Sequence, residues 1–292
     1  MQQFIGRDTT VLATGTIHEE VHASAHGRVS VRLLERASPT RGRILFVNGA
    51  FATMSGNRWA ERELVNHDIL SFDYPAMGAS RSHNDAVRPL SKEDEAEILV
   101  ELVERYRPAF LFSVSWGGMA ALLALSGQPA PIRRAVVGSF SARVTERLAA
   151  LSARGIAAAE RGDMAEAADV LLAGLGTTFP AKVQRAYRDY FAAFDAEQIA
   201  YGIAQMRTIV TLDPTRGEEG ASFRAALGRI EVPVLFVNGA LDEHTPPHSI
   251  LPMEAMVRRC GFAEIPDAGH FIPLDGPAPR RALCRAIDDW LM

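Results

Sequence analysis

A serine between a predicted strand and a predicted helix is the residue best placed to act as a nucleophile. Ser115 follows the apolar run 109–114 (AFLFSV) and precedes the apolar run 116–126 (WGGMAALLALS). A serine at such a sharp turn holds its hydroxyl above the sheet, and small flanking residues let strand and helix approach closely. The usual pattern has glycine two residues before and two after the serine; here Ser113 and Gly117 occupy these positions. The segment is therefore predicted to be a nucleophile elbow.

An acid and a histidine follow this serine in the order that accompanies such elbows. Asp242 stands shortly after the apolar run 232–237 (VPVLFV), and His270 lies in a loop between a short predicted strand and the last predicted helix. Asp242 is thereby predicted at the carboxyl end of a strand, where a triad acid belongs. His270 would remove the Ser115 proton, while Asp242 would fix the imidazole tautomer and stabilise the imidazolium.

Two other carboxylates compete with Asp242 for the acid role. Glu243 is the next residue, and Asp267 lies three residues before His270. Asp242 is preferred because the side chain of the residue that follows it tends to point the other way.

An acyl nucleophile also needs N–H donors for the tetrahedral oxyanion. One predicted donor is the backbone N–H of Trp116, directly after the nucleophile. The other is expected from the loop that follows the apolar run 43–47 and reads NGAFAT. Gly49 permits a tight turn that would aim the amide of Ala50 or Phe51 into the site. The alternative interpretation of this loop is an ordinary β–α turn.

Asp73 and Asn48 are candidates for supporting roles in the same site. Asp73 follows the apolar run 68–72, which places it at the same edge of the predicted sheet. Its carboxylate would either polarise a group in the site or only fix its own loop, whose Pro and Gly residues indicate turns. Asn48 opens the Asn-Gly turn of the predicted oxyanion loop.

Histidines and cysteines show no spacing typical of a metal site. His244 and His248 are four residues apart, but two intervening prolines exclude the helix that would align them. Cys260 and Cys284 are too few for a disulfide framework and are expected to be buried or surface thiols. No metal or organic cofactor is expected, because a serine triad needs neither. The other scattered histidines considered are His67 and His83.

Short, nearly all-apolar runs alternate with helical segments from residue 43 onward. Such runs are typical of parallel strands that are buried on both faces. Alternation of strand and helix predicts an α/β protein with a doubly wound, mostly parallel sheet and right-handed crossovers. The runs are 43–47, 68–72, 109–114, 134–138 and 232–237.

Further elements are predicted before and between these strands. The runs 10–16 and 27–34 have strand character, and the second alternates as a half-buried hairpin strand does. A helix is predicted over 91–106, where Ser91 three residues before Asp94 resembles a capping box. The run 116–126 is apolar all round and is predicted to be a buried helix.

The strand–helix alternation stops between about residues 143 and 228. This Ala-rich stretch is predicted to form several helices and no strand, as a cap over the carboxyl edge of the sheet. We therefore expect a core of residues 1–142 and 229–292 with an inserted cap of 143–228. The alternative is a second helical layer without a ligand role. Helix breaks are predicted at Gly155, Gly162, 174–176, Pro180 and Pro214.

Aromatic residues of the predicted cap recur near helical spacing. They would either pack a core or line an apolar tunnel for an acyl chain, and both interpretations stay open. These residues are Phe179, Tyr187, Tyr190, Phe191, Phe194 and Tyr201.

Composition excludes several classes of protein. With 292 residues, 48% of them hydrophobic and 23% charged, the chain is long enough for a sizeable core and is not of a disordered type. A net charge of −4 provides no basic field for nucleic acid. Residues 1–10 lack the features of a signal peptide, and no run of about 18 apolar residues occurs. We expect a cytoplasmic protein without stable membrane insertion.

Six segments resemble the bacterial 3-hydroxyacyl acyltransferases of the RhlA and PhaG kind, within an α/β-hydrolase-fold match over 27–292. Asn-Gly in place of the usual His-Gly, the Ser-x-Ser-Trp-Gly-Gly elbow and the Ser-Lys-Glu helix start are more specific than the fold alone. The segments are 47–53 (VNGAFAT), 71–81 (SFDYPAMGASR), 91–99 (SKEDEAEIL), 113–118 (SVSWGG), 235–243 (LFVNGALDE) and 268–271 (AGHF).

This resemblance implies (R)-3-hydroxyacyl thioester substrates carried on acyl carrier protein or coenzyme A. An RhlA-like enzyme esterifies one 3-hydroxyacyl unit with the hydroxyl of another, giving the 3-(3-hydroxyalkanoyloxy)alkanoic acid of rhamnolipid biosurfactants. A PhaG-like enzyme moves the acyl group between carrier and coenzyme A or releases the free acid. The family roles map onto Ser115 as nucleophile, Asp242 as acid and His270 as base.

The cap departs from this family, because 197–213 lacks an expected His-containing segment and 154–169 diverges. Acyl chain length and acceptor therefore stay open. The favoured hypothesis is an RhlA-like condensing acyltransferase that uses a Ser115 acyl-enzyme and a cap that excludes water. The alternatives are a PhaG-like transacylase, a serine esterase or thioesterase, and a non-catalytic ligand-binding relative.

Docking of a carrier protein would favour a basic patch near the mouth of the cap. The candidate residues are equally compatible with solvated helix faces, and oligomeric state is left open by the sequence. The candidates are Arg143, Arg147, Arg154, Lys182, Arg185 and Arg188.

Overall fold

A single mixed sheet organises the molecule. The computed structural model describes residues 5–12, 14–141, 143–211 and 217–292. Within these ranges nine strands pair in the order β1-β2-β3-β5-β4-β6-β7-β8-β9; neighbours among β1, β2, β3 and β5 are antiparallel, and β5 to β9 run parallel. The strands are β1 (Ile5–Leu12), β2 (Gly15–Ser24), β3 (Gly27–Arg36), β4 (Arg43–Val47), β5 (Asp68–Asp73), β6 (Phe110–Val114), β7 (Arg134–Gly138), β8 (Val234–Gly239) and β9 (Cys260–Ile265).

The five apolar runs predicted as parallel strands are confirmed as β4 to β8, with ends that differ by at most two residues. The prediction of one strand over 10–16 is wrong. Leu12 pairs with Gly15 across a tight hairpin, so the chain reverses within that run. Gly15 has a φ of 153°, and a Cβ there would lie 2.1 Å from the Glu35 carbonyl oxygen. The reversal therefore depends on glycine.

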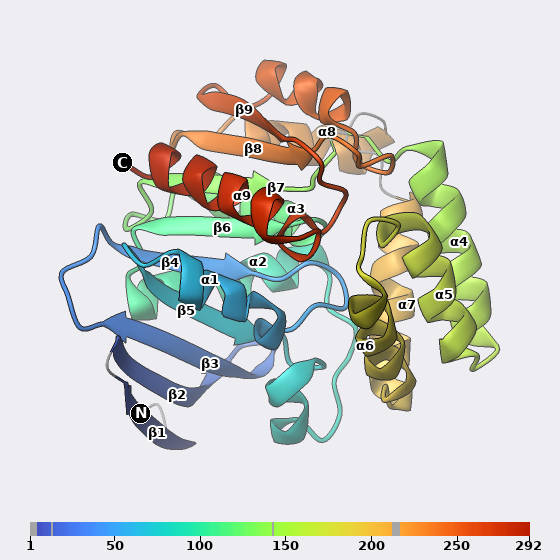
Figure 1. Ribbon diagram of the computed structural model, residues 1–292, viewed down its shortest axis with the longest axis horizontal. Coiled ribbons are helices and arrows are strands. Elements are labelled where there is room, and N and C mark those ends of the chain that lie inside the picture. Colours follow the sequence, from blue (N-terminus) through green and yellow to red (C-terminus); the bar gives the residue numbers. More distant parts are fainter. Residues whose placement is uncertain (1–4, 13, 142, 212–216) are drawn as a thin grey trace.

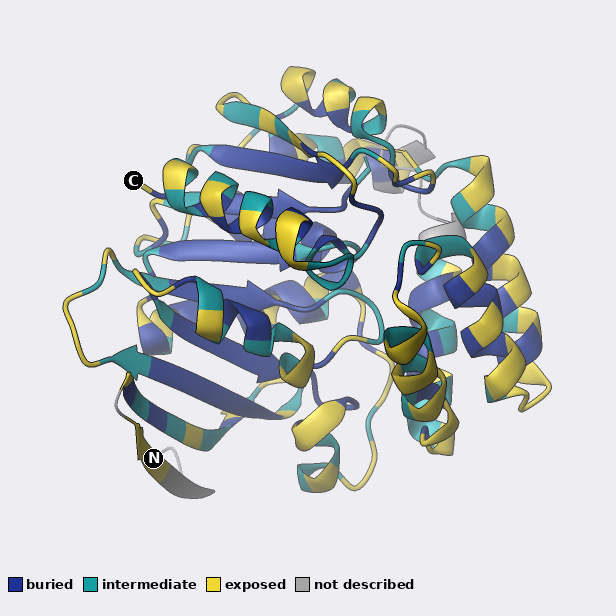
Figure 2. Ribbon diagram, viewed as in Figure 1, coloured by how far each residue is buried: buried dark blue, intermediate teal, exposed yellow. Residues whose placement is uncertain are grey.

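Helices cover both faces of the sheet (Figure 1). Alternate residues of β4 belong to two hydrophobic clusters, one on each face of the sheet. Ile44 and Phe46 pack with α1 and α9, whereas Leu45 and Val47 pack with α2 and α3. Figure 2 shows the corresponding pattern on α9, whose buried residues turn toward the sheet and whose exposed residues turn away. These helices are α1 (Arg58–Glu63), α2 (Lys92–Tyr106), α3 (Gly117–Ser126) and α9 (Pro277–Trp290).

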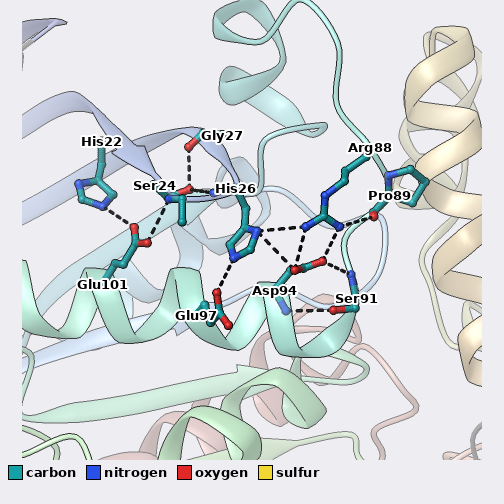
Figure 3. Close-up of polar contacts among 11 residues, drawn as sticks. His22, Ser24, His26, Gly27, Arg88, Pro89, Ser91, Asp94, Glu97 and Glu101 are labelled. Carbon is teal, nitrogen blue, oxygen red and sulfur yellow. Dashed lines mark hydrogen bonds and ion pairs between the residues drawn. The ribbon is translucent and has the colours of Figure 1, made fainter.

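The N-terminus of α2 has the capping box that the sequence predicts. The Ser91 hydroxyl accepts from the Asp94 N–H, and the Asp94 carboxylate accepts from the Ser91 N–H at 2.8 Å. The β2–β3 hairpin is tied to the same helix by His22–Glu101 and by His26, whose Nε2 lies 2.7 Å from a Glu97 carboxylate oxygen (Figure 3). The start of α2 is thereby fixed relative to the sheet. The run 116–126 is confirmed as a buried helix, α3.

Four helices form a separate group at the carboxyl ends of the parallel strands (Figure 1). A fifth helix, α8, instead packs against α3 on the sheet. The cap expected over 143–228 therefore includes one helix, α8, that packs with the core. The group, here called the cap helices, comprises α4 (Glu146–Glu160), α5 (Met164–Leu175), α6 (Ala181–Ala192) and α7 (Ala196–Thr211); α8 is Gly217–Leu227.

One predicted helix break in this region is wrong. Gly155 lies inside α4, and a Cβ there would lie 3.2 Å from the Met206 sulfur, so this glycine permits close packing between helices. Breaks at Gly162, at 174–176, where α5 ends at Leu175, and at Pro180 are confirmed. The predicted break at Pro214 falls outside the described residues.

Candidate active site

Ser115 occupies a strained turn between β6 and α3. Its φ of 53° is left-handed, a conformation that costs a non-glycine residue about 1–3 kcal/mol and clusters at functional sites. A Cβ on Gly117 would lie 2.1 Å from the Asn48 carbonyl oxygen, so glycine is required for α3 to approach the loop after β4. Ser113, at the other small-residue position, is fully buried. The turn has the geometry predicted for a nucleophile elbow.

The structure brings the three predicted triad residues together. Ser115 Oγ lies 2.8 Å from His270 Nε2, and His270 Nδ1 lies 2.8 Å from Asp242 Oδ2. Asp242 comes from the turn after β8, and His270 from the loop after β9. His270 and Asp242 are buried, whereas Ser115 is half-buried and lines a large cavity. This is the arrangement of a nucleophile, a base and an orienting acid.

Hydrogen bonds hold Asp242 as a carboxylate. Its Oδ1 accepts the backbone N–H groups of His244 and Thr245 at 2.9 Å each, and its Oδ2 accepts the Thr245 hydroxyl. Burial raises the pKa of Asp242, but the charge of His270 and the bonds from His270 and Thr245 outweigh it, so the pKa lies below its ordinary value. An ionised Asp242 can therefore stabilise a protonated His270.

The rival acids lie elsewhere. Glu243 is exposed and pairs with Arg147, and Asp267 is exposed on the turn after β9. Neither bonds to His270 among the described residues. The preference for Asp242 therefore agrees with the geometry.

Thr245 is a residue of this site that the sequence analysis missed. Besides its bond to Asp242, its hydroxyl oxygen lies 3.2 Å from His270 Nδ1. An Asp whose side chain accepts N–H groups two and three residues later is a recognisable Asx-type turn. The order Asp-x-x-Thr was the signal that could have identified it.

The predicted oxyanion donors lie around the same cavity as Ser115. The backbone N–H groups of Ala50, Phe51 and Trp116 have no hydrogen-bond partner within the ranges that the structure describes. Phe51 has a left-handed φ of 61°, and its carbonyl oxygen accepts the Tyr190 hydroxyl at 2.7 Å. Unpartnered donors beside a nucleophile are the feature that an oxyanion hole requires.

Asp73 and Asn48 hold the loop that carries these donors. Asp73 accepts the N–H groups of Met54 and Ala79 at 2.7 and 2.8 Å and does not line the large cavity. Burial raises the pKa of Asp73 to about 6. The Asn48 side chain donates to the Phe72 carbonyl oxygen at 2.8 Å. Of the two roles considered for Asp73, fixing loops is the one that its contacts support.

A cavity of about 430 Å³ lies between the sheet edge and the cap helices. This is within the range of ligand sites, roughly 300–1,000 Å³. Tyr187 and Tyr190 of α6 line it, whereas Phe191 of the same helix is buried in the core. Of the two interpretations of the cap aromatic residues, cavity lining therefore holds for Tyr187 and Tyr190, and core packing holds for Phe191. Phe179, Phe194 and Tyr201 are also buried and lie outside the lining.

A buried ion pair lies behind the oxyanion loop. Lys92 Nζ is 2.8 Å from a Glu95 carboxylate oxygen and 5.0 Å from the Trp116 ring centroid. The other Glu95 oxygen accepts the Tyr201 hydroxyl of α7 at 2.9 Å. The pair therefore links α2, the elbow and the cap helices, and the Ser-Lys-Glu helix start contributes the lysine of this pair.

The basic residues considered for carrier docking lie on α4, on α6 and in the loop before α4. Arg143 lines the cavity, Arg147 pairs with Glu243, and Arg188 pairs with Asp169. Lys182, Arg185 and Arg154 are exposed. No group of three His, Cys, Asp or Glu side chains suited to a metal ion occurs in the described ranges, and no helix there is long and apolar enough to span a membrane.

The parallel sheet, the strained serine turn and the hydrogen-bonded Ser, His and Asp define a protein of the α/β-hydrolase class. A model of the alpha/beta hydrolase family matches residues 44–286, and the chain belongs to this family. Two solved structures share the fold: the enol-lactonase of Burkholderia xenovorans LB400 (TM-score 0.74, 18% identity, 93% of this chain and 99% of that one) and an esterase of Exiguobacterium antarcticum (TM-score 0.74, 15% identity, 93% and 98%).

Curated relatives resemble the chain more closely in sequence. An (R)-3-hydroxydecanoyl-ACP:CoA transacylase of Pseudomonas aeruginosa is 33% identical over 236 residues, which are 80% of this chain and 77% of the relative. A transacylase of the same name from Ectopseudomonas oleovorans is 32% identical over 82% of this chain and 80% of the relative. These relatives agree with the resemblance inferred from the sequence motifs.

Proposed function

We propose that this protein transfers (R)-3-hydroxyacyl groups between acyl carrier protein and coenzyme A through an acyl-enzyme on Ser115. The observation that carries the proposal is the hydrogen-bonded series Ser115, His270 and Asp242 at the wall of a large cavity. The names of the curated relatives supply the substrate class.

In the first half-reaction Ser115 Oγ attacks the thioester carbonyl carbon while His270 Nε2 accepts the hydroxyl proton. The oxyanion is stabilised by the N–H of Trp116 and by that of Ala50 or Phe51. The C–S bond then breaks, and His270 returns the proton to the departing sulfur. The acyl group is left as an ester of Ser115.

In the second half-reaction the thiol of the acceptor takes the place of the departed thiol. His270 accepts the thiol proton, the sulfur attacks the Ser115 ester, and collapse of the oxyanion returns the proton to Ser115 Oγ. Asp242 stabilises the protonated His270 in both halves. The same atoms would catalyse hydrolysis with water as acceptor, so transfer depends on the cap helices limiting water at the ester.

Condensation with the 3-hydroxyl of a second acyl unit, as an RhlA-like enzyme performs it, uses the same acyl-enzyme with a different acceptor. This earlier preference stays a prediction, because the names of the relatives favour a thiol acceptor. Hydrolysis by an esterase or thioesterase is the third possibility, and the fold neighbours carry no argument for it beyond the fold.

The acceptor is tested by incubating the protein with (R)-3-hydroxydecanoyl-acyl carrier protein, with and without coenzyme A, and identifying products by mass spectrometry. The proposal expects (R)-3-hydroxydecanoyl-coenzyme A that requires Ser115, with Ser115→Ala as the control. Free 3-hydroxydecanoic acid as the sole product at every coenzyme A concentration would contradict transfer. An acyl–acyl ester as the main product would favour condensation instead.

A further inference from the structure

Two hydroxyl groups on the wall of the large cavity, those of Tyr187 and Ser152, have no hydrogen-bond partner among the described residues, and the ring of Tyr187 packs against Phe271, the residue next to His270. Most polar side chains there are already bonded: Tyr190 donates to the Phe51 carbonyl, Ser139 to the His270 carbonyl, and Thr245 to Asp242. The Tyr187 hydroxyl has no hydrogen-bond partner among the residues that the structure describes. Burial alone raises the pKa of Tyr187, so its hydroxyl is neutral and able both to donate and to accept.

Tyr187 is connected to His270 through one intervening aromatic ring. Its ring centroid is 4.9 Å from that of Phe191 and 6.1 Å from that of Phe271, whose own ring lies 5.0 Å from the His270 ring. Tyr190 is one turn further along α6, on the same face, and its hydroxyl bonds the oxyanion loop. Tyr187 therefore occupies the cavity wall between the histidine loop and the oxyanion loop.

The chemistry of an acyl chain restricts what this hydroxyl can meet. A saturated acyl chain offers no polar atom beyond its carbonyl, whereas a 3-hydroxyacyl chain carries a hydroxyl two carbons away. A hydroxyl that a bound acyl chain shuts off from water costs free energy when it has no partner, and a partner on the substrate removes that cost. Tyr187 lines the same cavity as Ser115, so its hydroxyl is available to a 3-hydroxyl on an acyl group held at that serine.

We propose that Tyr187 is a specificity-determining residue that hydrogen-bonds the 3-hydroxyl of the acyl group. This inference rests on the proposed function, because it takes the acyl-enzyme on Ser115 as the point from which the 3-hydroxyl is placed. It goes beyond that function in naming the side chain that distinguishes hydroxylated from plain acyl chains.

The test compares two donors that differ by one hydroxyl, (R)-3-hydroxydecanoyl- and decanoyl-acyl carrier protein, with coenzyme A as acceptor. In Tyr187→Phe, kcat/KM for the hydroxylated donor should fall about three- to tenfold, as expected for one lost hydrogen bond, while that for decanoyl is unchanged or higher. Tyr190→Phe is the matched variant on the same helix. It should lower both values equally, because Tyr190 holds the oxyanion loop.

Binding gives a second measurement that does not need turnover. In a Ser115→Ala background, Tyr187→Phe should weaken binding of 3-hydroxydecanoic acid about three- to tenfold and leave that of decanoic acid unchanged. An unaltered preference in Tyr187→Phe, in both turnover and binding, overturns the assignment of Tyr187 and leaves the transacylase proposal standing. Absence of Ser115-dependent turnover of either donor in the unmodified protein contradicts the proposed function itself.

Discussion

At the scale of single residues, hydrogen bonds rather than sequence position distinguish Asp242 from its neighbours. Its carboxylate accepts two backbone N–H groups and the Thr245 hydroxyl and faces His270 at 2.8 Å. Glu243 and Asp267 are exposed. The difference in surroundings predicts a sharp difference in the effect of neutralising each carboxylate.

Asp242→Asn should lower kcat for thioester cleavage by about 10³–10⁴, because the amide favours the wrong tautomer of His270 and cannot stabilise its protonated form. Glu243→Gln and Asp267→Asn should retain kcat within about twofold, since surface changes of this kind are nearly neutral. Formation of (R)-3-hydroxydecanoyl-coenzyme A from the acyl carrier protein donor measures the rate in each case. A loss in Asp267→Asn equal to that in Asp242→Asn would reassign the acid.

Asp73 predicts a pH dependence of stability. Burial raises its pKa to about 6 in the folded protein from an ordinary value of 3.8, so the folded state binds more protons than the unfolded state between these values. The contribution of Asp73 to stability is therefore present below pH 3.8 and is lost as the pH rises through 6. In Asp73→Asn this dependence is absent.

Urea unfolding of both proteins from pH 4 to pH 7.5 measures the effect. The free energy of unfolding of the unmodified protein should decrease relative to Asp73→Asn by about 2–3 kcal/mol across this range. A constant difference between the two proteins would mean that Asp73 is ionised throughout. The two N–H bonds to its carboxylate would then outweigh burial.

The three triad residues could be predicted because their signals are local. Ser115 follows an apolar strand and precedes Gly117, and Asp242 and His270 come next in a known order. The partners that hold them were not predictable in the same way. Ser139, for example, donates to the His270 carbonyl oxygen across 131 residues of sequence, and no local sequence pattern predicts such a bond.

At the scale of elements, strands and cap helices differ in how far the sequence determined them. The strands β4 to β8 are short apolar runs between turns, so their positions were predictable to within two residues. In the cap, the sequence predicts a break at Gly155, although this glycine lies inside α4 and permits close packing against Met206. A glycine can either end a helix or permit a neighbouring helix to pack closely. The sequence does not distinguish these two roles, because the difference depends on which helix packs against the glycine.

Orientation of α6 posed the same difficulty. Helical spacing of its aromatic residues is compatible with a core face and with a cavity face. Tyr187 and Tyr190 line the cavity and Phe191 lies in the core, which follows from how α6 packs against α5 and the loop after β4. That packing involves loops distant in sequence, such as the one that contains Phe51.

Contact between α7 and the oxyanion loop gives a prediction at this scale. A Cβ on Gly202 would lie 2.1 Å from Cε1 of Phe51, whose ring packs against Phe191 at 5.4 Å. Gly202→Ala should displace Phe51 and its loop, lowering kcat about tenfold and the free energy of unfolding by about 1–3 kcal/mol. Steady-state kinetics and urea unfolding measure these changes.

Gly228→Ala is the matched control, because a Cβ there meets no atom closer than 3.6 Å. Its kcat should equal that of the unmodified protein, and its unfolding free energy should change by less than about 1 kcal/mol. Equal behaviour of Gly202→Ala and Gly228→Ala would show that α7 does not support the oxyanion loop.

At the scale of the whole molecule, we propose that the cap helices decide which acceptor reaches Ser115. The core carries Ser115, Asp242 and His270, and residues of α4 to α7 line the cavity of about 430 Å³ beside them. Several side-chain contacts join the two parts, including Tyr190 to the oxyanion loop and Tyr201 to Glu95. A largely apolar cavity under the cap helices limits water at an ester, and this is the property that the proposed transfer requires.

The central claim is an acyl-enzyme on Ser115 that a thiol resolves faster than water does. Intact mass spectrometry after rapid mixing with (R)-3-hydroxydecanoyl-acyl carrier protein measures it directly. We expect a protein species heavier by one 3-hydroxydecanoyl group, absent in Ser115→Ala, that persists without acceptor and disappears when coenzyme A is added. No such species at any mixing time, or its decay at one rate with and without coenzyme A, would contradict the account.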